Sequence, residues 1–185
     1  GGDLPAYLST LALRARVLAV DARHAERVAQ LTQRTNQFNL GGLRLGAAEL
    51  LARAGRADTR DLAFSLRSVH EDQGIVGAAL GGPADGQWTI TNLVLSCRAF
   101  SRHLEHFMLA RLADAARAAG CGTLVGLYAP SARNQRFERF YLDAGFDEDA
   151  PAGPVRRFRL DLSRPVPAPA WIQDDTPDEH HHLPA

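Results

Sequence analysis

The sequence predicts an α/β fold in which helices flank a mixed central sheet. Its segments follow one another in the order β-α-α-β-β-β-α-β-α-β between residues 16 and 162. Two apolar strands, over 88–97 and 122–128, each break into a turn that opens a helix. At 185 residues the chain is long enough to bury a sizeable core. We therefore expect one α/β domain with tails.

The first half of the chain is expected to contain a strand, two helices and a strand pair. Asp21 is a good N-cap for the first helix. Residues 61–68 alternate between apolar and polar side chains, as a half-buried strand does. Turns are expected at 71–74, 81–83 and 85–86. The expected elements are a strand over 16–20, helices over 22–35 and 47–54, and strands over 61–68 and 75–80.

The second half alternates strands and helices. An apolar stripe that begins at Leu104 predicts a helix over 104–116. Phe137, Phe140 and Tyr141 stand at i, i+3 and i+4, so they share one face of a further helix that stops at Gly145. The expected elements are a strand over 88–97, a helix over 104–116, a strand over 122–128, a helix over 131–145 and a last strand over 155–162.

Composition excludes several classes of protein. The 21 basic and 21 acidic residues balance to a formal net charge of zero, which argues against an electrostatic nucleic-acid binder. No apolar run is long enough for a membrane span, and the chain does not open on a signal peptide. We expect a cytoplasmic protein with neither nucleic acid nor membrane as its partner. All 21 basic residues are Arg, which excludes chemistry that needs a Lys nucleophile.

The two cysteines, Cys97 and Cys121, lack the spacing of metal ligands, so no metal is expected. We expect both to be small buried apolar residues in a reducing cytosol. For Cys97 a nucleophilic role is the alternative, because it adjoins the turn that opens the helix at Leu104. His180–His182 could bind metal, but in a tail they are expected to be inert.

The chain divides into three expected parts. Residues 1–13 are an arm or linker whose apolar residues could form a short helix, and residues 14–162 form the folded domain. Residues 163–185 are Pro-rich and acidic, which predicts an extended or disordered tail. Trp171 and Ile172 are the expected anchors of that tail on the domain.

Two motifs in this order resemble those of GNAT-type acyltransferases. Arg98-x-x-Ser101-x-His103 is similar to the Q/R-x-x-G-x-G/A turn that holds the pyrophosphate of coenzyme A, although Ser101 and His103 replace its glycines. Residues 140–146, Phe-Tyr-Leu-Asp-Ala-Gly-Phe, are similar to the F-Y-x-x-x-G-F pattern. The resemblance implies a GNAT fold. It also implies a pyrophosphate held by backbone N–H groups at a helix N-terminus.

The same resemblance implies a set of site residues. The strand is expected to splay from its neighbour near Leu95, so that amides of Leu95, Ser96 or Cys97 can meet the thioester carbonyl. Tyr141 would protonate the leaving thiolate, or else pack in the core. Asn134 would bind the pantetheine amide, or else cap a helix. The cofactor-binding set is Leu95, Arg98, Ala99, Phe100, Ser101, Arg102, His103, Leu104 and Asn134.

Further segments resemble the C-terminal domain of FkbH-like proteins. Residues 34–39, Arg-Thr-Asn-Gln-Phe-Asn, are similar to the R-T-N-Q-F-N run of that family. Residues 74–77, 95–98 and 128–134 resemble its G-I-V-G, L-S-C-R and Y-x-P-T-x-K-N stretches. The resemblance covers roughly residues 12–162 and implies polyketide or related biosynthesis. An acyl-CoA or a phosphopantetheine thioester is then the expected donor, and an acyl carrier protein the expected partner.

The polar run after the first helix is a candidate for substrate binding. Its side chains offer donors and acceptors suited to an acyl chain or a phosphopantetheine arm, and the alternative is a capped loop with satisfied polar groups. The expected function is acyl transfer from a thioester. The alternative is a non-catalytic domain that binds an acyl group or a carrier protein. The candidate substrate-binding residues are Arg34, Thr35, Asn36, Gln37 and Asn39.

Overall fold

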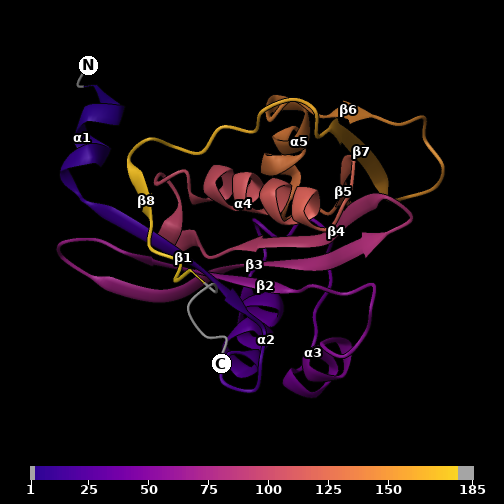
Figure 1. Cartoon of the computed structure of the whole chain (residues 1–185), viewed down its shortest axis with the longest axis horizontal. Coiled ribbons are helices and arrows are strands. Elements are labelled where there is room, and N and C mark those ends of the chain that lie inside the picture. Colours follow the sequence, from indigo (N-terminus) through magenta and orange to yellow (C-terminus); the bar gives the residue numbers. More distant parts are fainter. Residues whose placement is uncertain (1–2, 179–185) are drawn as a thin grey trace, which may run out of the picture.

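The computed structural model describes residues 3–178 and shows an eight-stranded mixed sheet (Figure 1). The strand order across the sheet is β6-β7-β5-β4-β3-β2-β1-β8. Strands β4 and β5 are parallel, as are β1 and β8, and the other neighbours are antiparallel. The strands are β1 (Leu13–Ala19), β2 (Leu62–Arg67), β3 (Asp72–Ala84), β4 (Gln87–Leu95), β5 (Thr123–Tyr128), β6 (Asp147–Glu148), β7 (Arg156–Asp161) and β8 (Ile172–Asp174).

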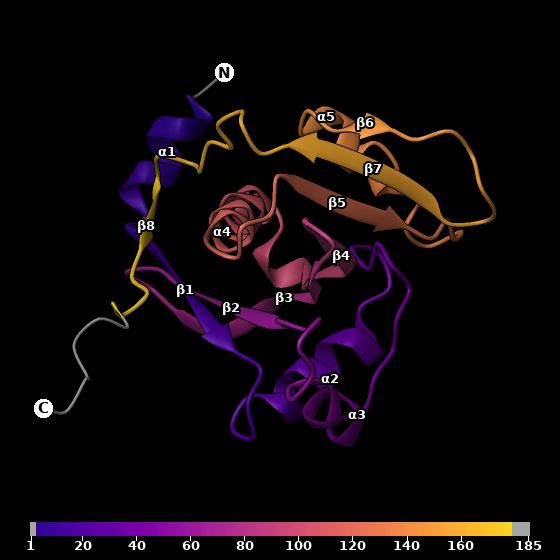
Figure 2. The same ribbon diagram turned by 45° about the vertical axis from the view of Figure 1, so that its right-hand side comes forward.

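Helices cover both faces of this sheet, which confirms the expected fold class. Figure 2 shows α2 and α3 on one side of the sheet and α4 on the other. Each face has its own apolar core: Val28 and Leu50 belong to the cluster under α2 and α3, and Phe107 and Leu112 to the larger cluster under α4. The helices are α1 (Leu4–Thr10), α2 (Ala25–Arg34), α3 (Ala47–Arg53), α4 (Leu104–Ala118) and α5 (Phe140–Asp143), with short 3-10 turns at Cys97–Ala99 and Gln135–Phe137.

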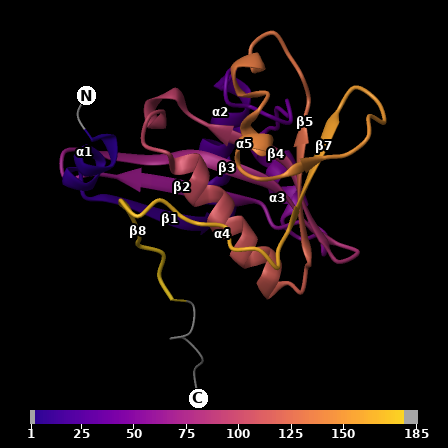
Figure 3. The same ribbon diagram turned by 90° about the horizontal axis from the view of Figure 1, so that it is seen from above.

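Both ends of the described chain pack on the domain. The expected short helix near the N-terminus is α1, and its Leu8 is fully buried. The segment after β7 runs along α4 to β8, which pairs with β1 (Figure 3). The two predicted anchors are confirmed, since Ile172 is buried and Trp171 Nε1 donates to the Arg102 carbonyl. His180–His182 lie outside the described residues.

Several boundaries differ from expectation, each for a local reason. Strand β3 continues through the expected turn at 81–83, because a register shift after Leu80 and two glycines at positive φ keep it paired with β4 as far as Ala84. Asp21 accepts from the N–H of Arg23 and His24 in a turn that precedes α2, so the helix begins at Ala25. The expected helix over 131–145 is broken into a 3-10 turn and α5. The short strands β6 and β8 were not expected.

The sheet opens between β4 and β5. These parallel strands pair from Gln87 opposite Thr123 only as far as Ile90 opposite Gly126. Beyond that point residues 38–40, which we call the strap, lie between them. Leu40 N–H donates to the Leu93 carbonyl at 3.0 Å, and Leu95 N–H donates to the Phe38 carbonyl at 3.0 Å. On the other side, Ala129 N–H donates to the Leu40 carbonyl at 2.7 Å.

Three buried side-chain amides hold the strap and its continuation in place. Asn92 accepts from Gly41 N–H at 2.7 Å and donates to the Leu43 carbonyl. Asn134 donates to the carbonyls of Asn39 and Ala129. Asn39 in turn donates to two carbonyls at the end of α2. Because buried amides are costly when they lack partners, this network specifies one path for the chain after α2.

The close approach of Gly41 to β4 generates a stability prediction. A Cβ at residue 41 would overlap the Thr91 carbonyl oxygen, which belongs to the backbone and cannot turn aside. We expect Gly41→Ala to lower the free energy of unfolding by about 1–3 kcal/mol, the usual range for overpacking. The measurement is denaturant unfolding. Gly55→Ala is the control, since a Cβ there meets nothing within 4 Å, and a loss as large as that of Gly41→Ala would refute the steric account.

Candidate functional site

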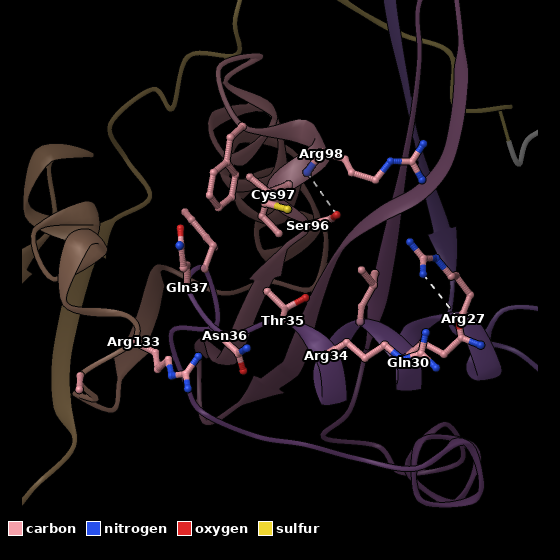
Figure 4. Close-up of a pocket in the computed structure, with 15 residues that line it drawn as sticks. Arg27, Gln30, Arg34, Thr35, Asn36, Gln37, Ser96, Cys97, Arg98 and Arg133 are labelled. Carbon is pink, nitrogen blue, oxygen red and sulfur yellow. Dashed lines mark hydrogen bonds between the residues drawn. The ribbon is translucent and has the colours of Figure 1, made fainter.

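A pocket of about 620 Å³ lies between the end of α2, the end of β4 and the loop after β5. Figure 4 shows its polar side chains gathered from these three segments. Of the candidate substrate-binding residues, Arg34, Thr35, Asn36 and Gln37 line it. Leu95, Ser96, Cys97, Arg98 and Phe100 close it from the β4 side. The structure thus brings two stretches that the sequence analysis treated separately into one site.

The pocket is strongly cationic. Arg27, Arg34, Arg98 and Arg133 line it, and no Asp or Glu among residues 3–178 does so. Partial burial and the charges of Arg98 and Arg34 lower the pKa of Arg27 from its ordinary value. Mutual repulsion of this kind is relieved when an anion binds. The site therefore suits a ligand with negative charge.

Two of these arginines were missed from the sequence. Arg27, Gln30 and Arg34 fall on one face of α2, opposite its buried stripe. That spacing was visible in the sequence, but an arginine face on an amphipathic helix is usually a solvated surface. Arg133 enters from the loop after β5, and only the tertiary fold brings it to the same cavity.

Cys97 is exposed, so the expectation that both cysteines are buried is wrong for it. It opens a 3-10 turn at the end of β4, where Ser96 Oγ accepts from Arg98 N–H. The sulfur of Cys97 lies in the pocket wall beside Ser96 (Figure 4). Cys121 is buried as expected, and desolvation raises the pKa of its thiol. The chain therefore has one thiol in the pocket and one in the core.

The turn before α4 keeps the backbone shape expected of a phosphate-binding turn. Ser101 and His103, which stand where the motif has glycines, adopt φ of 68° and 61°. Non-glycine residues rarely adopt this conformation. His103 precedes the first turn of α4, whose N–H groups lack helical acceptors. The replacements thus keep the turn but add side chains to it.

Phe38 and Phe100, which line the arginine pocket, belong to a cluster of aromatic side chains. Phe38 of the strap lies 4.7 Å from Phe137 and 5.2 Å from Phe140, measured between ring centroids. Phe100 contacts Phe137 at 5.4 Å. Of the candidate cofactor residues, Leu95, Arg98 and Phe100 line the pocket, whereas Ala99, Ser101, Arg102, His103, Leu104 and Asn134 do not.

The expectation of a free amide at Leu95 is wrong. Its N–H donates to the strap carbonyl of Phe38, and the N–H of Ser96 donates to the Val76 carbonyl at 2.8 Å. Two of the three amides that were expected to meet a thioester carbonyl, those of Leu95 and Ser96, are therefore engaged within the protein. Arg98 is also engaged, in an ion pair with Glu71 at 2.7 Å in which both side chains are about half exposed.

Asn134 and Asn39 serve the fold instead of the pocket. Asn134 is 1% exposed and accepts from Tyr128 Oη and Ser131 N–H, while both its N–H groups donate to carbonyls. Neither of its expected roles is found, since it does not cap the following 3-10 turn with its side chain. Asn39 is 3% exposed and likewise satisfied internally. A sequence does not distinguish such amides from ligand-binding ones.

Tyr141 lies in the core and does not line the pocket. It is 1% exposed, and its ring contacts Phe146 and Phe158 with centroids 5.0 and 5.5 Å away. Gly126 of β5 makes room for it, since a Cβ there would overlap the ring. Burial strongly raises the pKa of Tyr141, and its hydroxyl has no hydrogen-bond partner among the described residues. The packing alternative for Tyr141 therefore fits the structure better than the acid role.

His103, Glu105 and His106 come together at the start of α4. Their candidate ligand atoms lie within 4.8 Å of one another, and one Glu105 oxygen is buried without a partner. Burial and the neighbouring His103 lower the pKa of His106, while Glu105 opposes that shift. This cluster was not expected from the sequence, which assigned His103 to a phosphate turn.

No helix among residues 3–178 is long and apolar enough to cross a membrane.

Comparison with known proteins identifies the fold. No protein-family model matches the sequence, and no curated protein matches it. Among solved structures, the ribosomal-protein-S18-alanine N-acetyltransferase of Escherichia coli matches with a TM-score of 0.60 at 14% identity, over 80% of this chain and 94% of that one. The GNAT domain of S. lividans PAT matches with a TM-score of 0.60 at 19% identity, over 80% and 90%.

A third similar structure is the PaiA N-acetyltransferase of Thermoplasma acidophilum in complex with coenzyme A. It matches with a TM-score of 0.62 at 13% identity, over 80% of this chain and 98% of that one. The chain therefore has the GNAT acetyltransferase fold, as its two sequence motifs indicated. At these identities the likeness establishes the fold alone.

The unpartnered buried hydroxyl of Tyr141 generates a stability prediction. Tyr141→Phe removes a buried hydroxyl that has no partner and keeps the ring. An unsatisfied buried polar group costs about 1–3 kcal/mol, so we expect an unchanged or higher melting temperature. Thermal unfolding followed by circular dichroism measures it. A clear loss of stability would show that the hydroxyl has a partner the geometry lacks.

Proposed function

We propose that the chain is an acyltransferase that passes an acyl group from a coenzyme A or carrier-protein thioester through Cys97. The observation that carries this proposal is the exposed thiol of Cys97 in a pocket lined by four arginines. An exposed cysteine side chain can act as a nucleophile towards a thioester carbonyl. Direct transfer receives less support, because Leu95 N–H is engaged and Tyr141 is buried.

The proposed reaction proceeds in two balanced steps. The Cys97 sulfur attacks the carbonyl carbon of the donor thioester, a new C–S bond forms, the old C–S bond breaks, and the proton of the Cys97 thiol passes to the departing donor thiolate. An acceptor nucleophile then attacks the same carbonyl carbon and forms a bond to it. The Cys97 C–S bond breaks, and the acceptor's proton passes to the Cys97 sulfur, which restores the thiol. Covalent catalysis of this kind divides one difficult transfer into two easier ones.

Side-chain amides and guanidinium groups of the pocket supply the polar contacts. Asn36 Oδ1 accepts from Arg44 at 2.9 Å, which orients its amide and leaves its N–H groups for a ligand. Gln37 lines the same wall. N–H donors preorganised around a carbonyl stabilise the oxyanion that forms on it. This is the substrate-side role expected for Arg34, Thr35, Asn36 and Gln37, with Asn39 acting behind them.

The donor and partner are inferred from the resemblance to FkbH-like proteins in residues 34–39 and 95–98. It favours polyketide or related biosynthesis and a phosphopantetheine thioester on an acyl carrier protein. Because the strap fills the space between β4 and β5, the donor is proposed to enter the pocket from the α2 side. Two unpaired cysteines suit a reducing compartment such as the cytoplasm.

A specific observation favours a second function. With the strap in place and no carboxylate or imidazole from the described residues lining the pocket, no general base faces a bound acceptor. A domain that only binds an acyl thioester or its carrier protein would have these features. The two functions differ in whether Cys97 becomes acylated.

Acylation of Cys97 provides the test. We expect a stable mass increase of one acyl group when the chain is incubated with an acyl-loaded carrier protein or an acyl-CoA, because the thiol is exposed to the pocket. Cys97→Ser should abolish the adduct, and Cys121→Ala should keep it, since Cys121 is buried. Intact-protein mass spectrometry measures both. Binding of the donor without any adduct would favour the non-catalytic function.

A further inference from the structure

We infer that the pocket selects an acyl group that carries its own negative charge, a carboxylate or a phosphate remote from the thioester. This inference rests on the proposed function for the position of the acyl group, and it names the substrate class of that site.

Surface arginines of this chain are mostly paired with carboxylates. Arg53 is bound by Asp61 at 2.8 Å, and Arg156 by Glu148 at 2.7 Å. Asp175 alone serves Arg14, Arg16 and Arg67. The chain is neutral overall, so there are enough carboxylates to continue this pattern.

The pocket departs from that pattern. Among its arginines, Arg98 alone has a carboxylate partner in the described chain, and that carboxylate, Glu71, does not line the cavity. Arg27 makes a hydrogen bond from Nε to the Ile75 carbonyl, which leaves its charge unbalanced. Arg34 and Arg133 form no salt bridge with the described residues. Uncompensated like charges in one cavity weaken the fold unless an anion binds there.

The charges converge from opposite walls. Arg27 and Arg34 are seven residues apart on α2, so they project from the same face of the helix. Arg98 lines the same pocket from the end of β4. In Figure 4 these three side chains lie at one end of the pocket and Arg133 at the other. Cys97 stands between the two ends.

The position of Cys97 assigns the negative charge to the acyl group. An acyl group bound to this sulfur occupies the pocket, while the donor thiol departs. Ser101 and His103, the residues of the turn before α4, do not line the cavity. Guanidinium groups recognise carboxylate and phosphate by charge-assisted hydrogen bonds. A neutral acyl group would desolvate the arginines without giving them a partner.

Calorimetry with matched thioesters tests this inference in a Cys97→Ser background, where no acyl group is transferred. The probes are succinyl-CoA and butyryl-CoA, which share the cofactor and a four-carbon chain and differ in the terminal carboxylate. We expect succinyl-CoA to bind about tenfold or more tightly, as for a charge-assisted contact. Arg34→Gln should remove most of that difference. Arg56→Gln should keep it, since Arg56 is paired with Asp58 outside the pocket.

Three outcomes would overturn the inference: equal affinity for the two thioesters, equal weakening of both by Arg34→Gln, and no binding of either. Equal weakening would show that the arginines hold the phosphates of the cofactor. The result is distinguishable from failure of the proposed function. If calorimetry shows charge selectivity but mass spectrometry shows no adduct on Cys97, the anion-binding site is supported and only the covalent transfer through Cys97 is refuted.

Discussion

The hydrogen bonds between the strap and β4 are the interaction on which the rest of this structure depends. Leu95 and Leu93 present an open strand edge where β4 parts from β5, and the strap satisfies it with Leu40 N–H and the Phe38 carbonyl. Open edges and buried polar groups are costly, so the chain closes its own sheet here. The same contacts place Phe38 in the core and direct the end of α2 towards Cys97.

In the function proposed above, acyl transfer takes place away from the gap between β4 and β5, because the strap closes that gap. The N–H of Leu95 is engaged, and Ser101 and His103 do not line the pocket. The pocket lies on the α2 side of the sheet, where Cys97 and four arginines line it. In the proposed function, the closed edge of β4 and the exposed Cys97 thiol together place acyl transfer on the α2 side of the sheet.

The layered fold could be predicted because periodicity and motif order are local properties of the sequence. The turn at Ser101 and His103 kept its shape despite losing both glycines, since two residues held at positive φ preserve it. The strap could not be predicted, because its partners in β4 and after β5 are far along the chain. For the same reason the sequence leaves two roles open for Tyr141, an acid or a core residue, and two for Asn134, a pantetheine contact or a helix cap, and the fold buries both side chains. The predicted ends of strands and helices are wrong where a glycine or a single capping residue determines them, as at Gly81 in β3 and Asp21 before α2.

Amide hydrogen exchange of the strap, measured by NMR with and without coenzyme A, tests the central claim most directly. The N–H groups of Leu40, Leu95 and Ala129 report on the three strap hydrogen bonds. If the strap closes the sheet permanently, these amides stay protected to the same degree when the ligand binds. Faster exchange on binding, together with ligand contacts at the edge of β4 near Leu95, would show that the cofactor displaces the strap. That result would contradict entry from the α2 side.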